Sequence, residues 1–174
     1  MKAMVIEACC DMALTPAPLV PMDLPPPVPG PGELLVEVAV CGVCHTELDE
    51  IEGRTPPPRF PVIPGHQIVG TVAASGPGSE GFAPGDAVGI AWIFHACGSC
   101  AFCRSGRENL CPAFVATGRD VNGGYAEYVT VPAAFAHRLP AGLEAASVAP
   151  MLCAGAIGYR SLELSGLADG QDLG

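Results

Sequence analysis

Four cysteines are crowded into one short segment of this chain: Cys97, Cys100, Cys103 and Cys111. A tetrahedral zinc ion is held by four thiolate sulfurs at about 2.3 Å. Two-residue gaps let the first three cysteines wrap around one ion, and the longer gap returns Cys111 as the fourth ligand. Because protein atoms would then fill every position, the predicted zinc is structural. Disulfides are the alternative, but cysteines so close together pair poorly without strain.

Composition indicates a folded domain rather than a disordered or membrane protein. The chain has 174 residues, 49% hydrophobic and 15% charged, which is enough for one ordinary hydrophobic core. Its net charge of −10 argues against nucleic acid or an anionic membrane as a partner. No apolar run approaches the roughly 20 residues of a membrane span. The first ten residues include Glu7 and lack a long apolar core, so we expect no signal peptide and a cytoplasmic protein.

The hydrophobic pattern predicts a mainly β fold with a few helices. Twenty-two glycines and 19 prolines favour short strands joined by turns. Residues 15–32 are proline-rich and are expected to be an extended connector. An alanine-rich run from Glu144 to Leu162 is compatible with a helix. The predicted strands cover residues 3–7, 33–40, 68–74, 87–92, 123–131 and 135–139.

A second set of metal ligands is dispersed along the chain: Cys44, His66 and Cys153. Two thiolates and one imidazole would leave a fourth coordination position open, which is typical of a catalytic zinc. The gaps between these residues are long, so spacing alone does not bring them together. Cys41 and Cys44 could instead form a redox pair, although a β-rich chain does not suit the helix start of a thioredoxin-like motif.

Several short motifs together resemble the zinc-dependent alcohol dehydrogenases of the medium-chain dehydrogenase family. The resemblance covers nearly all of the chain, and the motifs occur in the family's order. They are Gly42-Val43-Cys44-His45-Thr46-Glu47-Leu48, Gly65-His66, Pro84-Gly85-Asp86-Ala87-Val88, the four-cysteine segment, Gly123-Gly124-Tyr125-Ala126-Glu127-Tyr128 and Met151-Leu152-Cys153-Ala154-Gly155.

The resemblance implies a GroES-like, partly open β-barrel in residues 1–150, with a zinc-binding lobe at about residues 95–113. Residues 151–174 would then be a helical link to a Rossmann domain that binds NAD or NADP. The glycine-rich fingerprint of that domain is absent from these residues. We therefore expect an N-terminal fragment that is inactive alone, from a parent enzyme that is a candidate homo-oligomer.

The same resemblance implies a role for each matching residue and a total of two zinc ions per chain. Cys44, His66 and Cys153 match the catalytic zinc ligands, and the four-cysteine segment matches the structural ligands. Thr46 matches the hydroxyl that hydrogen-bonds the substrate oxygen, although it could simply cap a helix. Glu47 matches a carboxylate that orients the ligand histidine.

Two further positions match roles at the edge of the site. His45 matches a residue that meets the cofactor pyrophosphate. Trp92 resembles a bulky wall of the substrate pocket, and its alternative role is that of a core aromatic residue.

Two positions depart from the family pattern. Gln67 stands where glutamate usually follows the ligand histidine; it could be an occasional zinc ligand or a neighbour of the ligands. Asp49 stands where related enzymes often place a proton-relay histidine, and its carboxylate could still pass a proton.

The implied function is interconversion of small alcohols with aldehydes or ketones by hydride transfer to NAD(P). Two rival functions remain open. One is a non-catalytic binding module that zinc only stabilises. The other is a zinc-free quinone reductase of the same superfamily, against which the four-cysteine lobe argues.

Overall fold

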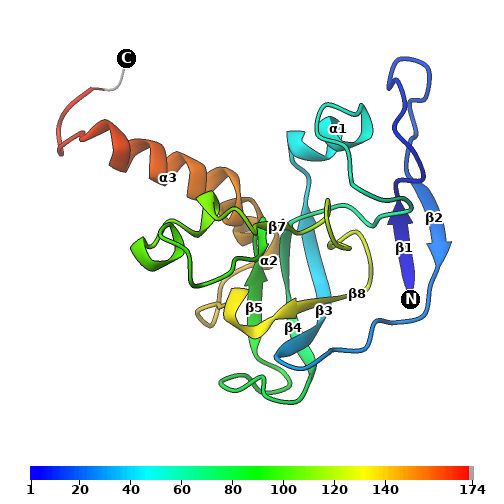
Figure 1. The fold of residues 1–174 in the computed structure, drawn as a ribbon, viewed down its shortest axis with the longest axis horizontal. Coiled ribbons are helices and arrows are strands. Elements are labelled where there is room, and N and C mark those ends of the chain that lie inside the picture. The colour runs from blue at the N-terminus through cyan, green and yellow to red at the C-terminus, as the bar shows by residue number, and fades with distance from the viewer. Residues whose placement is uncertain (173–174) are drawn as a thin grey trace.

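A five-stranded antiparallel sheet forms the centre of the computed structural model, which describes residues 1–172 (Figure 1). The strand order is β8-β3-β4-β5-β9. The fold is therefore mainly β, as predicted. The strands are β3 (Glu33–Gly42), β4 (Gln67–Ser75), β5 (Ala87–Ile90), β8 (Tyr128–Pro132) and β9 (Ala136–Arg138).

Alternation along β3 places its apolar side chains in the core. Leu34 and Val36 are fully buried, whereas Glu37 on the opposite face is exposed. Two shifts of register interrupt the pairing of β3 with β4, and such irregularities bend and twist a sheet. The buried core cluster is completed by residues of β4, β5 and β8: Ile68, Val72, Val88, Ile90, Val129 and Val131.

The proline-rich connector contains a short strand that the sequence did not predict. Strand β1 (Lys2–Val5) pairs antiparallel with β2 (Val20–Asp23) in a separate two-stranded sheet. Pro21 faces Met4 across this pair, which is tolerated because β2 is an edge strand. The remainder of the connector contains no helix or further strand, and has a bend at Pro16 and a turn at residues 31–32.

The predicted strand at residues 123–131 is shorter in the structure, where β8 begins only at Tyr128. Gly123 and Gly124 instead pack against the loop that carries Gly65. A Cβ at Gly123 would lie 2.0 Å from the carbonyl oxygen of Gly65. The paired glycines thus allow a close backbone approach next to His66, at the expense of regular strand geometry.

The four-cysteine segment forms a lobe between two short paired strands, β6 (Ile93–His95) and β7 (Val115–Ala116). Within the lobe lie two 3₁₀ turns, η1 (Cys103–Ser105) and η2 (Glu108–Leu110). The predicted strand at residues 87–92 is shorter in the structure, because β5 ends at Ile90 and Trp92 lies in a bend before β6.

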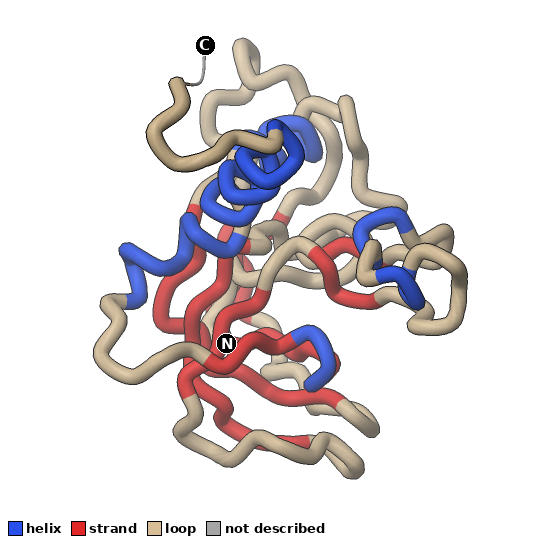
Figure 2. The backbone as a smooth tube through the Cα atoms, turned by 90° about the vertical axis from the view of Figure 1, so that its left-hand side faces the viewer, coloured by secondary structure: helices blue, strands red, loops and turns tan. Residues whose placement is uncertain are grey.

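The alanine-rich C-terminal run is helical but broken into pieces. These are α2 (Ala145–Val148), the 3₁₀ turn η4 (Ala149–Leu152) and α3 (Ala154–Ser165), and Cys153 lies at the break before α3. Figures 1 and 2 show α3 leading away from the sheet towards the C-terminus. A third 3₁₀ turn, η3 (Ala133–Phe135), links β8 to β9.

Candidate metal centres

The lobe brings the sulfur atoms of its four cysteines together in one cage. All four sulfurs lie within 4.8 Å of one another. The Cys100 and Cys103 sulfurs are 3.5 Å apart, and those of Cys97 and Cys103 are 3.9 Å apart. Sulfurs at the corners of a tetrahedral zinc site lie about 3.8 Å apart, given Zn–S bonds of about 2.3 Å. The cage therefore fits a zinc ion and is far too wide for disulfides, and all nine cysteines are free thiols.

Backbone groups of the lobe prepare these sulfurs for a cation. The N–H of Cys97 donates to the Cys111 sulfur at 3.3 Å, and that of Cys103 donates to the Cys100 sulfur at 3.4 Å. Hydrogen bonds from the backbone and hydroxyl of Ser99 lower the pKa of the Cys97 thiol to about 6. Donors that stabilise a thiolate also hold it in a metal-binding orientation.

A second centre lies where three distant segments meet. Cys44 ends the loop after β3 and is the N-cap of α1 (His45–Ile51). His66 immediately precedes β4, and the antiparallel register places Gly42 opposite Gln67. Cys153 comes from the turn between η4 and α3. The three ligand atoms lie within 4.8 Å of one another, and the two sulfurs are 3.8 Å apart.

The donor set of this second centre suits zinc with one open position. The S–S distance matches the edge of a zinc tetrahedron, and within residues 1–172 only three candidate protein ligands converge. Burial acts to raise the pKa of Cys44, but hydrogen bonds from Thr46 and Cys153 hold it below its ordinary value. Burial and the adjacent Cys44 raise the pKa of Cys153 to about 11. Cys44 is therefore the first of the two thiols to ionise, and a cation would be needed to ionise both.

Glu47 lies directly beside the histidine of this centre. Its Oε1 lies 2.8 Å from Nδ1 of His66, and both side chains are almost completely buried. Its Oε2 accepts a hydrogen bond of 2.6 Å from the Cys44 N–H, which closes the first turn of α1. With Nδ1 facing a carboxylate, Nε2 of His66 is left as the ligand atom. One carboxylate thus contacts two of the three candidate ligand residues.

Replacing Glu47 with glutamine is expected to weaken zinc binding at this centre by about 10- to 100-fold. An amide can still cap α1, but it cannot favour the Nδ1–H form of His66 as strongly as a carboxylate does. Competition with a chromophoric chelator measures the affinity. Glu80→Gln, at an exposed loop residue, is the matched control. An unchanged affinity in Glu47→Gln would show that the contact is not needed for metal binding.

A cavity of about 390 Å³ opens beside this centre. His66 and Cys153 lie at its metal end together with Thr46, whose hydroxyl oxygen is 3.5 Å from the Cys44 sulfur. Trp92 lines the wall and meets the His66 ring edge-on, with ring centroids 4.9 Å apart. The predicted alternative role of Thr46 as the helix cap does not apply, because Cys44 is the N-cap of α1. Trp92 lines the cavity.

The other predicted residues lie around the centre rather than in it. Gln67 is buried, and its side chain lies against Gly42, where a Cβ would come within 2.6 Å of its amide oxygen. Asp49 accepts a hydrogen bond from Arg54 and lies 3.6 Å from Nε2 of His45. The His45 side chain is 75% exposed. Neither His45 nor Asp49 lines the cavity beside the metal centre.

Glu50 is a buried acid that the sequence analysis missed. It is fully buried, and within residues 1–172 neither carboxylate oxygen has a hydrogen-bond partner. Burial, and then the charge of Glu47, raise its pKa to about 8, with Arg119 partly opposing them. Arg119 pairs with Asp120 and lies over the Trp92 ring. The sequence does contain a signal for the burial of Glu50, because Glu47, Glu50 and Ile51 have the spacing of residues on one buried helix face.

The stability of the metal-free protein is expected to fall as pH rises from about 4.5 to 6, the range below the pKa of about 6 of the Cys97 thiol, whose ionisation has the opposite effect. In this window Glu50 is protonated when folded but ionised when unfolded, so the unfolded state binds fewer protons. One such group contributes a slope of at most about 1.4 kcal/mol per pH unit. Urea unfolding with a chelator present measures it. Glu50→Gln should flatten this slope and Glu52→Gln should not; equal slopes in all three proteins would contradict the assignment.

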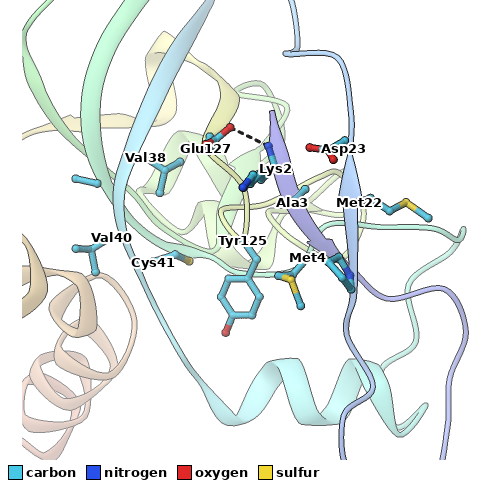
Figure 3. Close-up of a pocket in the computed structure, with 13 residues that line it drawn as sticks. Lys2, Ala3, Met4, Met22, Asp23, Val38, Val40, Cys41, Tyr125 and Glu127 are labelled. Carbon is cyan, nitrogen blue, oxygen red and sulfur yellow. Dashed lines mark hydrogen bonds between the residues drawn. The ribbon is translucent and has the colours of Figure 1, made fainter.

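A larger cavity, of about 670 Å³, has none of the candidate metal ligands in its lining (Figure 3). It separates β1 and β2 from the end of β3, and the Lys2 N–H donates to Glu127 at its rim. Cys41 lines it, and burial raises the pKa of this thiol to about 12. A thiol this reluctant to ionise is a poor nucleophile, which disfavours a Cys41–Cys44 redox pair.

Comparison with known proteins agrees with this fold. Residues 30–141 match the family model of the alcohol dehydrogenase GroES-like domain. A probable alcohol dehydrogenase AdhA of Mycobacterium tuberculosis (strain CDC 1551 / Oshkosh) is 53% identical, over 88% of this chain and 48% of that protein. An alcohol dehydrogenase of Geobacillus stearothermophilus is 45% identical, over 80% of this chain and 42% of that protein.

Solved structures give the same result. A crystal structure of an NAD-dependent alcohol dehydrogenase superposes with a TM-score of 0.89 at 34% identity, covering 99% of this chain and 49% of that one. The chain therefore belongs to the zinc-type alcohol dehydrogenases of the medium-chain dehydrogenase family, and it carries their GroES-like domain. It spans about half the length of the curated relatives it matches.

A further solved structure is that of CAD from Helicobacter pylori, complexed with NADP(H). It superposes with a TM-score of 0.86 at 26% identity, covering 98% of this chain and 50% of that one. Within residues 1–172, no helix combines the length and the apolar character that crossing a membrane requires.

Proposed function

We propose that this domain provides the catalytic metal centre of a dehydrogenase that interconverts alcohols with aldehydes or ketones, using NAD or NADP. The observation that carries the proposal is the three-ligand centre of Cys44, His66 and Cys153, open to a cavity with a hydroxyl at its edge. A centre that served only to stabilise the fold would be closed by a fourth protein ligand. A second, closed centre in the lobe is the one suited to stabilising the fold.

Zinc bound at this centre would supply Lewis-acid polarisation of the substrate oxygen. A nicotinamide dinucleotide would supply the hydride acceptor. The chain's own side chains bind and orient the substrate. Thr46 is placed to exchange a hydrogen bond, and then the proton, with a substrate hydroxyl at the mouth of the centre.

We propose Asp49 and His45 as the outer members of the proton path that begins at Thr46. Asp49 Oδ1 lies 3.6 Å from Nε2 of His45, and this imidazole reaches solvent. Arg54 also holds Asp49, which fixes the carboxylate but competes for its lone pairs. The exposed His45 is also our candidate for contact with the cofactor pyrophosphate. Proton transfer to solvent and contact with the cofactor pyrophosphate both require a side chain that lies outside the apolar cavity.

Cobalt substitution tests the proposal directly at the metal. Cobalt(II) bound by two thiolates and one imidazole has visible bands that change when a fourth ligand binds. Adding a primary alcohol or its aldehyde to the cobalt-loaded chain is expected to shift these bands. A Cys44→Ser variant, which retains the lobe, gives the spectrum of the lobe site alone. If the bands of the three-ligand site do not respond to any alcohol or aldehyde, the site is closed and the proposal fails.

A further inference from the structure

The cavity beside the three-ligand centre is lined by one further polar side chain, besides Thr46 and the metal ligands. Thr46, His66 and Cys153 lie at the metal end, and Asn109 is contributed from the four-cysteine lobe. The remaining side chains are predominantly apolar: Ala91, Trp92, Ile93, Leu152, Ala156 and Ile157. A bound molecule would therefore meet a hydrogen-bonding group from the lobe in addition to those at the metal centre, within an otherwise apolar lining.

The Asn109 amide is available to a ligand. Its side chain is exposed, and it makes no hydrogen bond to another residue in the described part of the chain. An amide can both donate and accept, so it can pair with a hydroxyl or a carbonyl. Most apolar pockets gain their specificity from a few such groups.

The lobe also holds Asn109 in a defined position. Asn109 is the central residue of the 3₁₀ turn η2. The N–H of Leu110 donates to the carbonyl of Arg107 at 3.0 Å, and that of Cys111 donates to the carbonyl of Glu108 at 3.0 Å. Cys111 is itself one of the four sulfurs of the lobe cage. The backbone that carries the amide is thus tied to the candidate structural metal site.

We propose that Asn109 is a specificity-determining residue, and that the site prefers alcohols and aldehydes with an apolar body and a second hydrogen-bonding group. This inference rests on the proposed function, because it assumes that the substrate oxygen binds at the three-ligand centre. It adds a second role for the lobe, which holds part of the substrate site as well as stabilising the fold.

A matched ligand series tests this inference. Straight-chain alcohols and the α,ω-diols of equal length differ only in the distal hydroxyl. Trp92 is the only tryptophan in the chain and lines the cavity, so quenching of its fluorescence in the zinc-loaded protein reports binding. After correction for its two equivalent ends, the diol should bind about three- to tenfold more tightly at one best chain length. Asn109→Leu should abolish this preference and retain alcohol binding; Glu108→Gln, on the same turn, should retain both.

The outcomes separate this inference from the proposed function. If alcohols bind but diols have no advantage, or if the advantage survives in Asn109→Leu, the role of Asn109 is wrong and the metal centre stands. If metal analysis finds the three-ligand centre loaded but no alcohol quenches Trp92, the proposed function fails and this inference fails with it. A fall in zinc content in Asn109→Leu would also contradict the inference, because the residue would then be supporting the lobe alone.

Discussion

Replacing Cys153 with serine is expected to lower the zinc content from two ions per chain to one. The lost ion is that of the three-ligand centre, where the Cys44 and Cys153 sulfurs are 3.8 Å apart. A serine hydroxyl does not ionise as a thiol does, and two protein ligands hold zinc poorly. Elemental analysis after dialysis measures the change.

The control for this variant is Cys9→Ser, at an exposed thiol outside both centres, which should keep two ions. Thermal unfolding should show that the lobe is intact in both variants. Two tightly bound ions in Cys153→Ser would mean that this residue is not a ligand, whatever its distance from Cys44.

Replacing Cys103 with serine should have the largest effect on stability. Cys103 is buried within a small cluster formed with Ala96 and Cys111, and the lobe contains little other apolar core. Loss of its metal removes the main constraint on the segment between β6 and β7. We expect a loss on the order of 4 kcal/mol of unfolding free energy, since metal loss is among the few single changes with so large an effect.

Limited proteolysis and thermal unfolding measure the effect of Cys103→Ser. Cleavage should appear first within the lobe, between Cys97 and Cys111, and the melting temperature should fall well below that of Cys9→Ser. The preference for diols should disappear as well, because Asn109 would no longer be held at the cavity. A Cys103→Ser protein that melts and resists protease like the unmodified chain would show that the lobe does not depend on a metal.

The sequence predicted features whose determinants are close together in the chain. The lobe was predicted because its four cysteines lie within one short segment. The alternation of apolar residues with glutamate predicted β3 and its buried face, and Leu34 and Val36 are in the core.

The three-ligand centre could not be derived from spacing. Cys44 and Cys153 are 109 residues apart in the chain, and the fold brings them together. The pairing of Gly42 with Gln67 brings His66 to Cys44, and the break between η4 and α3 presents Cys153. The sequence grouped these three residues by ligand type alone, and the resemblance to a known family supported the same grouping.

Other features of the site depend on contacts that leave little trace in the sequence. Glu50 lies in an acidic stretch that resembles a solvated helix, yet it is completely buried. Asn109 belongs by sequence to the metal lobe, and only the position of η2 in space brings it to the cavity. In both cases the position of the side chain depends on a tertiary contact between separate segments, which the local sequence pattern does not reveal.

Anomalous diffraction at the zinc edge, from crystals of the zinc-loaded protein, tests the two-centre account most directly. The account predicts two peaks per chain. One should lie among the sulfurs of Cys97, Cys100, Cys103 and Cys111, and the other between Cys44, His66 and Cys153. A single peak in the lobe, or a second peak away from these three residues, would contradict the assignment of a catalytic metal centre to this domain.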